Sequence, residues 1–241
     1  MPDIDLFLVY TVLLAAAAIV YAYVKGKIDL SAVAASGIIG AVALLTVGGL
    51  WLYLILAFFV AGNLVTRYRY DVKEHEGVAE KTRSFQNVFG NGGAAIVYAL
   101  LYQLTGGNNL FILGFAGAMA TATADTFATE IGEVHALEPR MITTFRKVRV
   151  GTSGAVSLPG SVAALAGAAI IAWIPLFFQP AFDMYRFFAA VTVSGFLGCL
   201  VDSIIGATME RKVRIIDNHM TNFIGTLFGG AFALAIYSLL V

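Results

Sequence analysis

The chain has 241 residues, of which 59% are hydrophobic and only 12% are charged, and its formal net charge is zero. Because soluble domains carry about 25% charged residues, this composition excludes an ordinary soluble globular protein. The neutral balance also argues against a nucleic-acid partner, which selects for a basic surface. The sequence therefore predicts an all-α, polytopic helical membrane protein, folded as a single transmembrane domain over residues 1–241.

Long apolar runs alternate with short polar segments along the chain. Hydropathy predicts eight membrane spans, with seven as the alternative, because only two glycines separate the second span from the third. No basic stretch precedes the first span, so we expect no cleaved signal peptide. The predicted spans lie near residues 6–24, 31–47, 50–66, 91–105, 110–129, 155–173, 187–207 and 221–240.

The basic residues gather on one side of this predicted topology. Eight spans place residues 25–30, 67–90, 130–154 and 208–220 on the same side, and these segments contain 14 of the 15 lysines and arginines. By the positive-inside rule this side is cytoplasmic, and both termini lie outside. We therefore expect a plasma-membrane protein whose active site is cytoplasmic and is built from the polar segments near 67–90, 130–154 and 208–220.

The first long polar segment ends in a helix face that suits a polar head group. Arg83, Asn87 and Asn91 follow one another at intervals of four residues and share one face of a helix that enters the membrane. Guanidinium and amide groups on one face can hold the phosphate of a lipid or of a nucleotide. The preceding string DVKEHEGVAEK indicates a solvated surface, so we assign no function to His75.

Two spans carry an aspartate near their cytoplasmic ends. Asp125 lies in ADTFATEIGE and Asp202 in VDSIIGATME, and in both strings a glutamate follows eight residues later, at Glu133 and Glu210. An ionisable group at membrane depth is costly and marks a functional site by default. Carboxylates on parallel helices, next to Thr or Ser hydroxyls, are the oxygen ligands that Mg²⁺ prefers. The alternative is that each aspartate only hydrogen-bonds a neighbouring helix.

Two more acids are candidates for a second ion or for support of the first. Glu130 follows Asp125 by five residues, which is about 140° around an ideal helix. The two carboxylates could ligate one ion only if the helix departs from regular geometry, which Gly132 would permit. Alternatively, Glu130 binds a basic partner at the membrane interface. Asp217 lies just before the last span.

A basic, glycine-rich turn precedes the sixth span. Lys147 and two neighbouring arginines come just before the string GTSG at residues 151–154. Such a turn at a helix N-terminus offers backbone N–H groups to an anion, and the helix dipole adds to the attraction. The turn therefore predicts a phosphate site. The alternative is a topology signal, in which the charges only anchor the segment at the cytoplasmic surface.

The polar strings, in this order, resemble the phytyl-phosphate kinase family of integral membrane proteins. The matching strings cover most of the chain from residue 84 onward: SFQNVFGNGG, ATADTFATEIGE, RMITTFRKVRVGTSGAVSLPGS, GFLGCLVDSIIGAT and DNHMTNFIGT. One departure is Ala155, where the family pattern has glycine. A more distant similarity is to the dolichol and phytol kinases and to the phosphatidate cytidylyltransferases.

The resemblance implies a Mg²⁺-dependent kinase. A nucleoside triphosphate, often CTP, would give its terminal phosphoryl group to an isoprenyl monophosphate such as phytyl or geranylgeranyl phosphate, which becomes the diphosphate. A prenyl-alcohol kinase or a lipid cytidylyltransferase is the alternative among enzymes, and an ion-coupled transporter is the alternative of another class. The expected partners are the nucleotide, the isoprenyl phosphate and membrane lipids, and a homo-oligomer is left open.

Residue chemistry and this resemblance together define the candidate site. As catalytic residues we expect Asp125, Glu130, Asp202 and Lys147, and as metal ligands Asp125, Glu130, Asp202 and Asp217. For the nucleotide or its phosphates we expect Arg83, Asn87, Asn91, Thr144, Gly151, Thr152, Gly154, Ser157, Asn218 and Asn222.

Overall fold

The computed structural model describes residues 6–79, 82–178, 182–210 and 213–240, and these ranges are almost entirely helical. A 3₁₀ turn over Ile174–Phe177 extends helix α7 (Leu158–Trp173). Two-residue strands β1 (Arg140–Met141) and β2 (Ala155–Val156) pair antiparallel in the only sheet of the described ranges. The helices are α1 (Leu6–Val24), α2 (Leu30–Thr46), α3 (Gly49–Arg67), α4 (Tyr70–His75), α5 (Phe85–Leu104), α6 (Leu110–His135), α7 (Leu158–Trp173), α8 (Met184–Thr208) and α9 (Asn218–Leu240).

Each of the eight predicted spans has a helix in its place, so the polytopic helical fold is confirmed. By length and composition, five helices of the described ranges could cross a membrane: α3, α6, α7 with its 3₁₀ extension, α8 and α9. Leu8–Val24 within α1 and the whole of α2 are apolar but shorter, and α5 is outside the set of five. A count of eight spans therefore stays a prediction, while the membrane-spanning character of the chain does not depend on it.

Short polar side chains start the helices where the sequence leaves the apolar runs. The Asp29 carboxylate accepts a hydrogen bond from the Ala32 N–H at 2.8 Å and caps α2. At the start of α5, Asn87 Oδ1 accepts from the Ser84 N–H at 2.9 Å in a capping box. Ser157 Oγ accepts from the Gly160 N–H at 3.2 Å and caps α7. These caps satisfy N–H groups that have no partner in the first helical turn.

Helix α6 lies at the centre of the bundle and packs against α3, α5, α7, α8 and α9. Glycine and alanine allow this close approach, as expected for helices that pack within a membrane. A Cβ atom on Gly117 would lie 2.6 Å from the Ala233 Cβ and 2.8 Å from the Gly229 carbonyl oxygen of α9. Likewise, a Cβ atom on Gly167 of α7 would lie 2.9 Å from the Thr123 carbonyl oxygen of α6. A larger side chain at either glycine would separate the helices.

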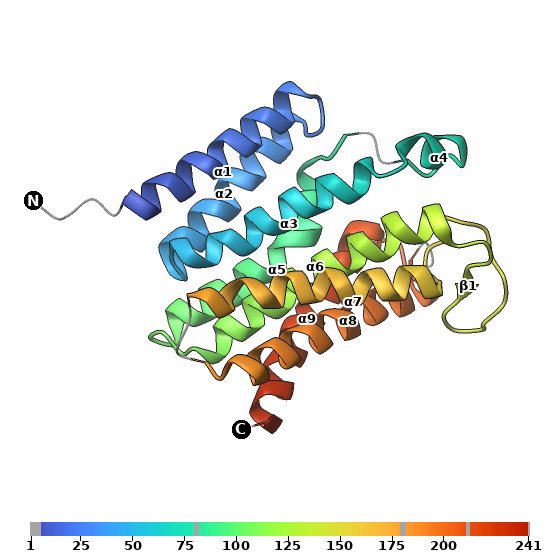
Figure 1. Ribbon diagram of the computed structural model, residues 1–241. Helices are drawn as coiled ribbons and strands as arrows, with labels where there is room; N and C mark the ends of the chain where they lie inside the picture. Colours follow the sequence, from blue (N-terminus) through green and yellow to red (C-terminus); the bar gives the residue numbers. More distant parts are fainter. Residues whose placement is uncertain (1–5, 80–81, 179–181, 211–212, 241) are drawn as a thin grey trace, which may run out of the picture.

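The polar segments gather at one end of the molecule. Figure 1 shows α4 and β1 at this end, whereas α1 begins and α9 finishes at the other end. The connection between α1 and α2 also belongs to the polar end, because the Asp29 N–H donates to the Arg83 carbonyl at 3.0 Å and the Arg83 N–H donates to the Lys27 carbonyl at 2.9 Å. The arrangement agrees with the predicted alternation of spans. Residues 80–81 and 211–212 of the polar segments lie outside the described ranges.

Candidate functional site

A polar cavity of about 390 Å³ lies at this end, between the last turns of α6 and α8, the first turns of α7 and the turn before β2. Four carboxylic acids line it: Asp125 and Glu133 from α6, Asp202 from α8, and Glu210 just after α8. The repeated spacing of eight residues thus places both members of each pair at one cavity. Glu133 and Glu210 were not expected as site residues, although this spacing was the signal that could have identified them.

One stripe of α6 faces the cavity. Asp125, Thr129, Gly132 and Glu133 recur at helical spacing and all line it. On the facing helix α7, a Cβ atom on Gly160 would lie 2.9 Å from the Ala128 carbonyl oxygen. Small residues in both helices therefore let α6 and α7 approach closely beside the cavity, which fixes the position of the acids.

Asp202 enters the same cavity from the parallel helix α8. It lies against α9, where a Cβ atom on Gly225 would be 3.0 Å from the Asp202 Cβ. With its amide oriented to donate, Asn222 Nδ2 lies 3.1 Å from Asp202 Oδ2. On the α6 side, the Cys199 thiol is 3.8 Å from Asp125 Oδ1. Both aspartates thus have hydrogen-bonding neighbours on adjacent helices, and they share one cavity with Asn218 at its edge.

The glycine-rich turn forms another wall of the cavity. Gly151, Thr152 and Gly154 line it, and the two glycines have φ values of +75° and +76°, which L-residues with side chains rarely adopt. Ser153 Oγ donates to a carboxylate oxygen of Glu210, which holds the turn against the end of α8. The turn does not open the sixth span directly, because β2 follows it and α7 begins at Leu158. Its phosphate-binding groups would be its own N–H groups rather than a helix N-terminus.

Eight expected site residues are not among the described residues that line the polar cavity: Glu130, Asp217, Lys147, Thr144, Arg83, Asn87, Asn91 and Asn222. Lys147, in the exposed loop between the strands, donates to Glu138, which lies just before β1. This hydrogen bond, with the lysine charge, holds the pKa of Glu138 below its ordinary value. Thr144 belongs to the same loop, where its hydroxyl oxygen accepts a hydrogen bond from the Arg146 N–H at a nitrogen–oxygen distance of 3.5 Å. Asp217 Oδ1 accepts from the Met220 N–H at 2.8 Å at the start of α9.

Glu130 points away from the polar cavity into a buried ion pair. Lys73 Nζ lies 2.5 Å from Glu130 Oε2, and the Thr66 hydroxyl donates to Glu130 Oε1 at 2.6 Å. The structure thus shows the alternative in which Glu130 binds a basic partner. The expectation of a solvated 71–81 segment was wrong for Lys73, which is 1% exposed, and right for His75, whose side chain is 90% exposed. No pattern in the sequence distinguishes Lys73 from its exposed neighbours.

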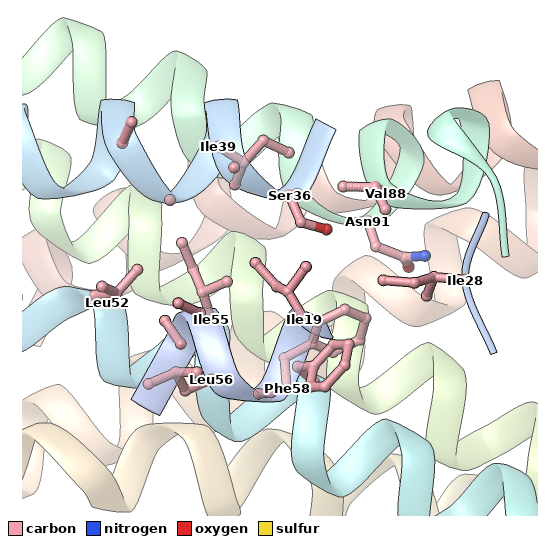
Figure 2. A pocket seen from close by; sticks show the side chains of 18 of the residues that line it. Ile19, Ile28, Ser36, Ile39, Leu52, Ile55, Leu56, Phe58, Val88 and Asn91 are labelled. Atoms are coloured by element: carbon pink, nitrogen blue, oxygen red, sulfur yellow. The ribbon is translucent and has the colours of Figure 1, made fainter. Parts of the chain in front are cut away.

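Arg83, Asn87 and Asn91 line a different cavity, between α1, α2, α3 and α5. This cavity is about 310 Å³ and mainly apolar, and Figure 2 shows Asn91 and Ser36 among aliphatic and aromatic side chains. The sequence had left open whether these residues bind a lipid phosphate or a nucleotide. Their position sets them apart from the polar cavity, among apolar side chains.

The donor set of the polar cavity fits Mg²⁺ bound together with a phosphorylated ligand. Within the described ranges, no three His, Cys, Asp or Glu side chains converge into a complete metal site. Mg²⁺ does not need such a cage, because it is usually bound by one or two carboxylates together with substrate phosphates and water. Asp125 and Asp202 supply two carboxylates, and Ser203 and Thr129 add hydroxyls at the same cavity.

These features define a polytopic helical membrane protein with an acid-lined polar cavity at one end. The chain belongs to the integral membrane protein family DUF92, whose sequence profile matches residues 13–230. An uncharacterized membrane protein of Methanocaldococcus jannaschii is 37% identical over 210 residues, which are 87% of this chain and 86% of that protein. Protein VTE6, chloroplastic, of Arabidopsis thaliana is 32% identical over 213 residues, which are 85% of this chain and 63% of that protein.

An uncharacterized membrane protein of a Synechocystis species is also 32% identical, over 192 residues, which are 76% of this chain and 72% of that protein. No solved structure matches the chain significantly. The resemblance to the phytyl-phosphate kinase family, drawn from the motifs, is confirmed by this family membership and by the similarity to VTE6.

Proposed function

We propose that this protein is a Mg²⁺-dependent kinase that converts an isoprenyl monophosphate to the diphosphate, with CTP as the preferred donor. One observation carries the proposal: Asp125, Asp202 and the turn at residues 151–154 surround a single polar cavity. Carboxylates for a metal and N–H groups for phosphates are the parts that phosphoryl transfer requires. The similarity to VTE6 and the family membership support a prenyl-phosphate kinase and do not favour a transporter.

In this mechanism the chain mainly positions charges. Asp125 and Asp202 would hold Mg²⁺. The bound ion would neutralise part of the negative charge of the phosphates. The N–H groups of Gly151 and Gly154 would hold the nucleotide phosphates, whereas the N–H and the hydroxyl of Thr152 both donate to the Arg149 carbonyl and shape the turn. Ser157 and Asn218 lie at the same cavity for further hydrogen bonds. Closely packed small residues of α6 and α7 beside the cavity keep the acids in place.

The transfer itself needs little acid–base help from the protein. An oxygen of the acceptor monophosphate, already anionic at neutral pH, would form a bond to the terminal phosphorus of the nucleotide. The bond from that phosphorus to the bridging oxygen breaks, and the nucleoside diphosphate leaves with the electron pair. No histidine is required, in agreement with the exposed position of His75. The cavity would face the cytoplasm, where nucleotides are available.

The proposal is tested with the purified protein, Mg²⁺, a panel of nucleoside triphosphates, and prenyl alcohols and monophosphates of several chain lengths. Mass spectrometry should find a prenyl diphosphate formed only from the monophosphate. A monophosphate formed from the alcohol would instead identify an alcohol kinase, and a nucleotide-linked lipid would identify a cytidylyltransferase. Either product in place of the diphosphate would overturn the proposal.

A further inference from the structure

The cavity between α1, α2, α3 and α5, here called the N-terminal groove, has one polar end and one apolar end. Figure 2 shows Leu52 and Leu56 toward one end and Asn91 and Ile28 toward the other, with Ile19 and Ile55 between them. Arg83 and Asn87 also line it. A channel of this kind matches an amphiphile whose tail is apolar and whose head is anionic.

We propose that the N-terminal groove binds the isoprenyl monophosphate, with its tail between α1, α2 and α3 and its phosphate at Arg83 and Asn91. The choice of ligand rests on the proposed function, whereas the location rests on the groove itself. Arginine suits a phosphate because its planar guanidinium can donate two parallel hydrogen bonds. Ser36 and Asn87 add polar groups from two helices.

The space for the tail comes from the composition of α1. The run of four alanines at 15–18 replaces the large side chains found elsewhere in this helix, and Ala15, Ala16 and Ala18 line the groove. Ala17 is exposed on another face of the helix and does not line it. Small residues at these positions leave a channel that longer aliphatic side chains would fill.

Arg83 is held in place from several sides. Its backbone is tied to the connection between α1 and α2, as described above, and its Nη2 donates to the Thr66 hydroxyl at 3.2 Å. Thr66 in turn donates to Glu130, whose charge is balanced by buried Lys73. Glu130 and Lys73 are therefore positioning residues, because they act on the lipid phosphate through Thr66 and Arg83.

The polar end of the groove lies next to the part of α6 that carries the catalytic aspartate. Arg83 Nη1 and the Thr126 Cγ2 are 3.7 and 3.8 Å from the point where a Cβ atom on Gly62 would stand. Thr126 directly follows Asp125 in α6. A phosphate held by Arg83 would thus lie beside α6 on a different face from Asp125. Direct transfer then requires the prenyl phosphate to shift from Arg83 along α6 into the polar cavity, where the donor phosphate would be bound.

We favour a single prenyl chain over a diacyl phospholipid as the occupant. The groove is a single cavity of about 310 Å³, and the only charged side chain that lines it in the described ranges is Arg83. A prenyl monophosphate has one tail for the single cavity and one anionic head for the single arginine. Phosphatidic acid has the same kind of head but two tails, so it serves as the discriminating competitor.

The test compares Ala18→Phe with the matched control Ala17→Phe, which adds the same side chain to the same helix outside the groove. Equilibrium binding of geranylgeranyl monophosphate is measured without nucleotide, on protein in nanodiscs. Filling the groove should weaken binding about tenfold in Ala18→Phe, with a change below about twofold in Ala17→Phe. Ala15→Phe, on the same face of α1, is an independent second variant.

A head-group variant completes the test. Arg83→Met should weaken binding of the monophosphate much more than binding of the corresponding alcohol, and Arg83→Lys should restore part of the difference. Unchanged lipid binding in both Ala18→Phe and Ala15→Phe overturns the site. Equal competition by dioleoyl phosphatidic acid overturns the choice of a prenyl ligand.

The failure of this inference differs from a failure of the proposed function. Groove-dependent binding of the monophosphate, in a protein that phosphorylates no prenyl compound, would keep the groove site and reject the kinase. Conversely, kinase activity with an unchanged KM for the lipid in Ala18→Phe would keep the kinase and reject the groove.

Discussion

The carboxylic acids of α6 differ in the groups that surround them, and this difference separates their roles. Glu130 has a buried lysine at 2.5 Å, so its charge is already balanced inside the protein. Asp125 instead lines a polar cavity together with Asp202, and the Cys199 thiol donates to its Oδ1 at 3.8 Å. Only an acid whose charge is not balanced by a protein cation is well placed to attract a metal ion.

At Asp125 and Asp202 we expect Asn substitutions to abolish turnover. The amide keeps the size of the side chain and some of its hydrogen bonding, but it loses the charge that would bind Mg²⁺. Product formation is followed over a range of Mg²⁺ concentrations, and thermal unfolding in detergent serves as the control for folding. Near-normal activity of either variant at low Mg²⁺ would mean that this aspartate is only a structural partner.

Lys147 gives a second prediction at the residue scale. Because it pairs with Glu138 in an exposed loop and not with groups of the cavity, Lys147→Ala should change the nucleotide KM by less than about twofold, as is usual for exposed ion pairs. Steady-state kinetics with the nucleotide as the varied substrate measure this. A tenfold rise in KM would instead show that the loop brings Lys147 onto the nucleotide.

At the scale of elements, the Lys73 side chain attaches the short helix α4 to the bundle. Lys73 Nζ donates to the Val65 and Thr66 carbonyl oxygens at the end of α3, and it pairs with Glu130 of α6. The carbonyl groups of the last helical turn have no partner within their own helix. Lys73 therefore provides hydrogen-bond donors for the last carbonyl groups of α3 and balances the charge of Glu130 on α6. Both contacts hold α4 against the bundle.

We expect Glu130→Gln to lower thermal stability clearly, because it leaves the buried Lys73 charge without its partner. Removing one member of a buried ion pair costs about 3–5 kcal/mol, whereas replacing both members with apolar residues is far less harmful. The double variant Lys73→Met/Glu130→Leu should therefore unfold at a higher temperature than Glu130→Gln in the same detergent. The opposite order would argue against a stabilising pair.

How far the sequence predicts the elements depends on what each residue contacts. Helix positions follow from local hydropathy, so all eight apolar segments appear as helices with ends displaced by a few residues. The joint cavity of Asp125 and Asp202 follows from equal depth on parallel helices. Lys73, by contrast, is buried only because α4 folds back onto α3 and α6. Such a contact between distant segments leaves no local pattern.

At the scale of the whole molecule, α6 separates two cavities. One stripe with Asp125, Thr129 and Glu133 lines the polar cavity, and Met119 on another stripe lines the N-terminal groove. Thr126 and Glu130 follow Met119 by seven and eleven residues, which returns them to nearly the same face. The sequence contains both stripes, but only the packed structure shows that they face different cavities.

The orientation in the membrane is tested with single cysteines. Replacing Cys199 by serine gives a cysteine-free background, because the chain has no other cysteine. A membrane-impermeant thiol reagent should label Cys at Gly106 in intact cells, and it should label Cys at Glu76 or Glu138 only after the membrane is opened, since basic segments stay inside. Reversed labelling would place the polar cavity outside and remove it from the supply of nucleotides.

The position of α6 between the two cavities also has a kinetic consequence. A substrate delivered through the bilayer and another delivered through water would occupy the protein together, and neither would have to leave before the other arrives. Initial rates measured against both substrates should then give intersecting double-reciprocal lines, as for a ternary complex, and not the parallel lines of a phosphorylated enzyme intermediate. The supply of lipid and the supply of nucleotide could therefore limit the flux independently of each other.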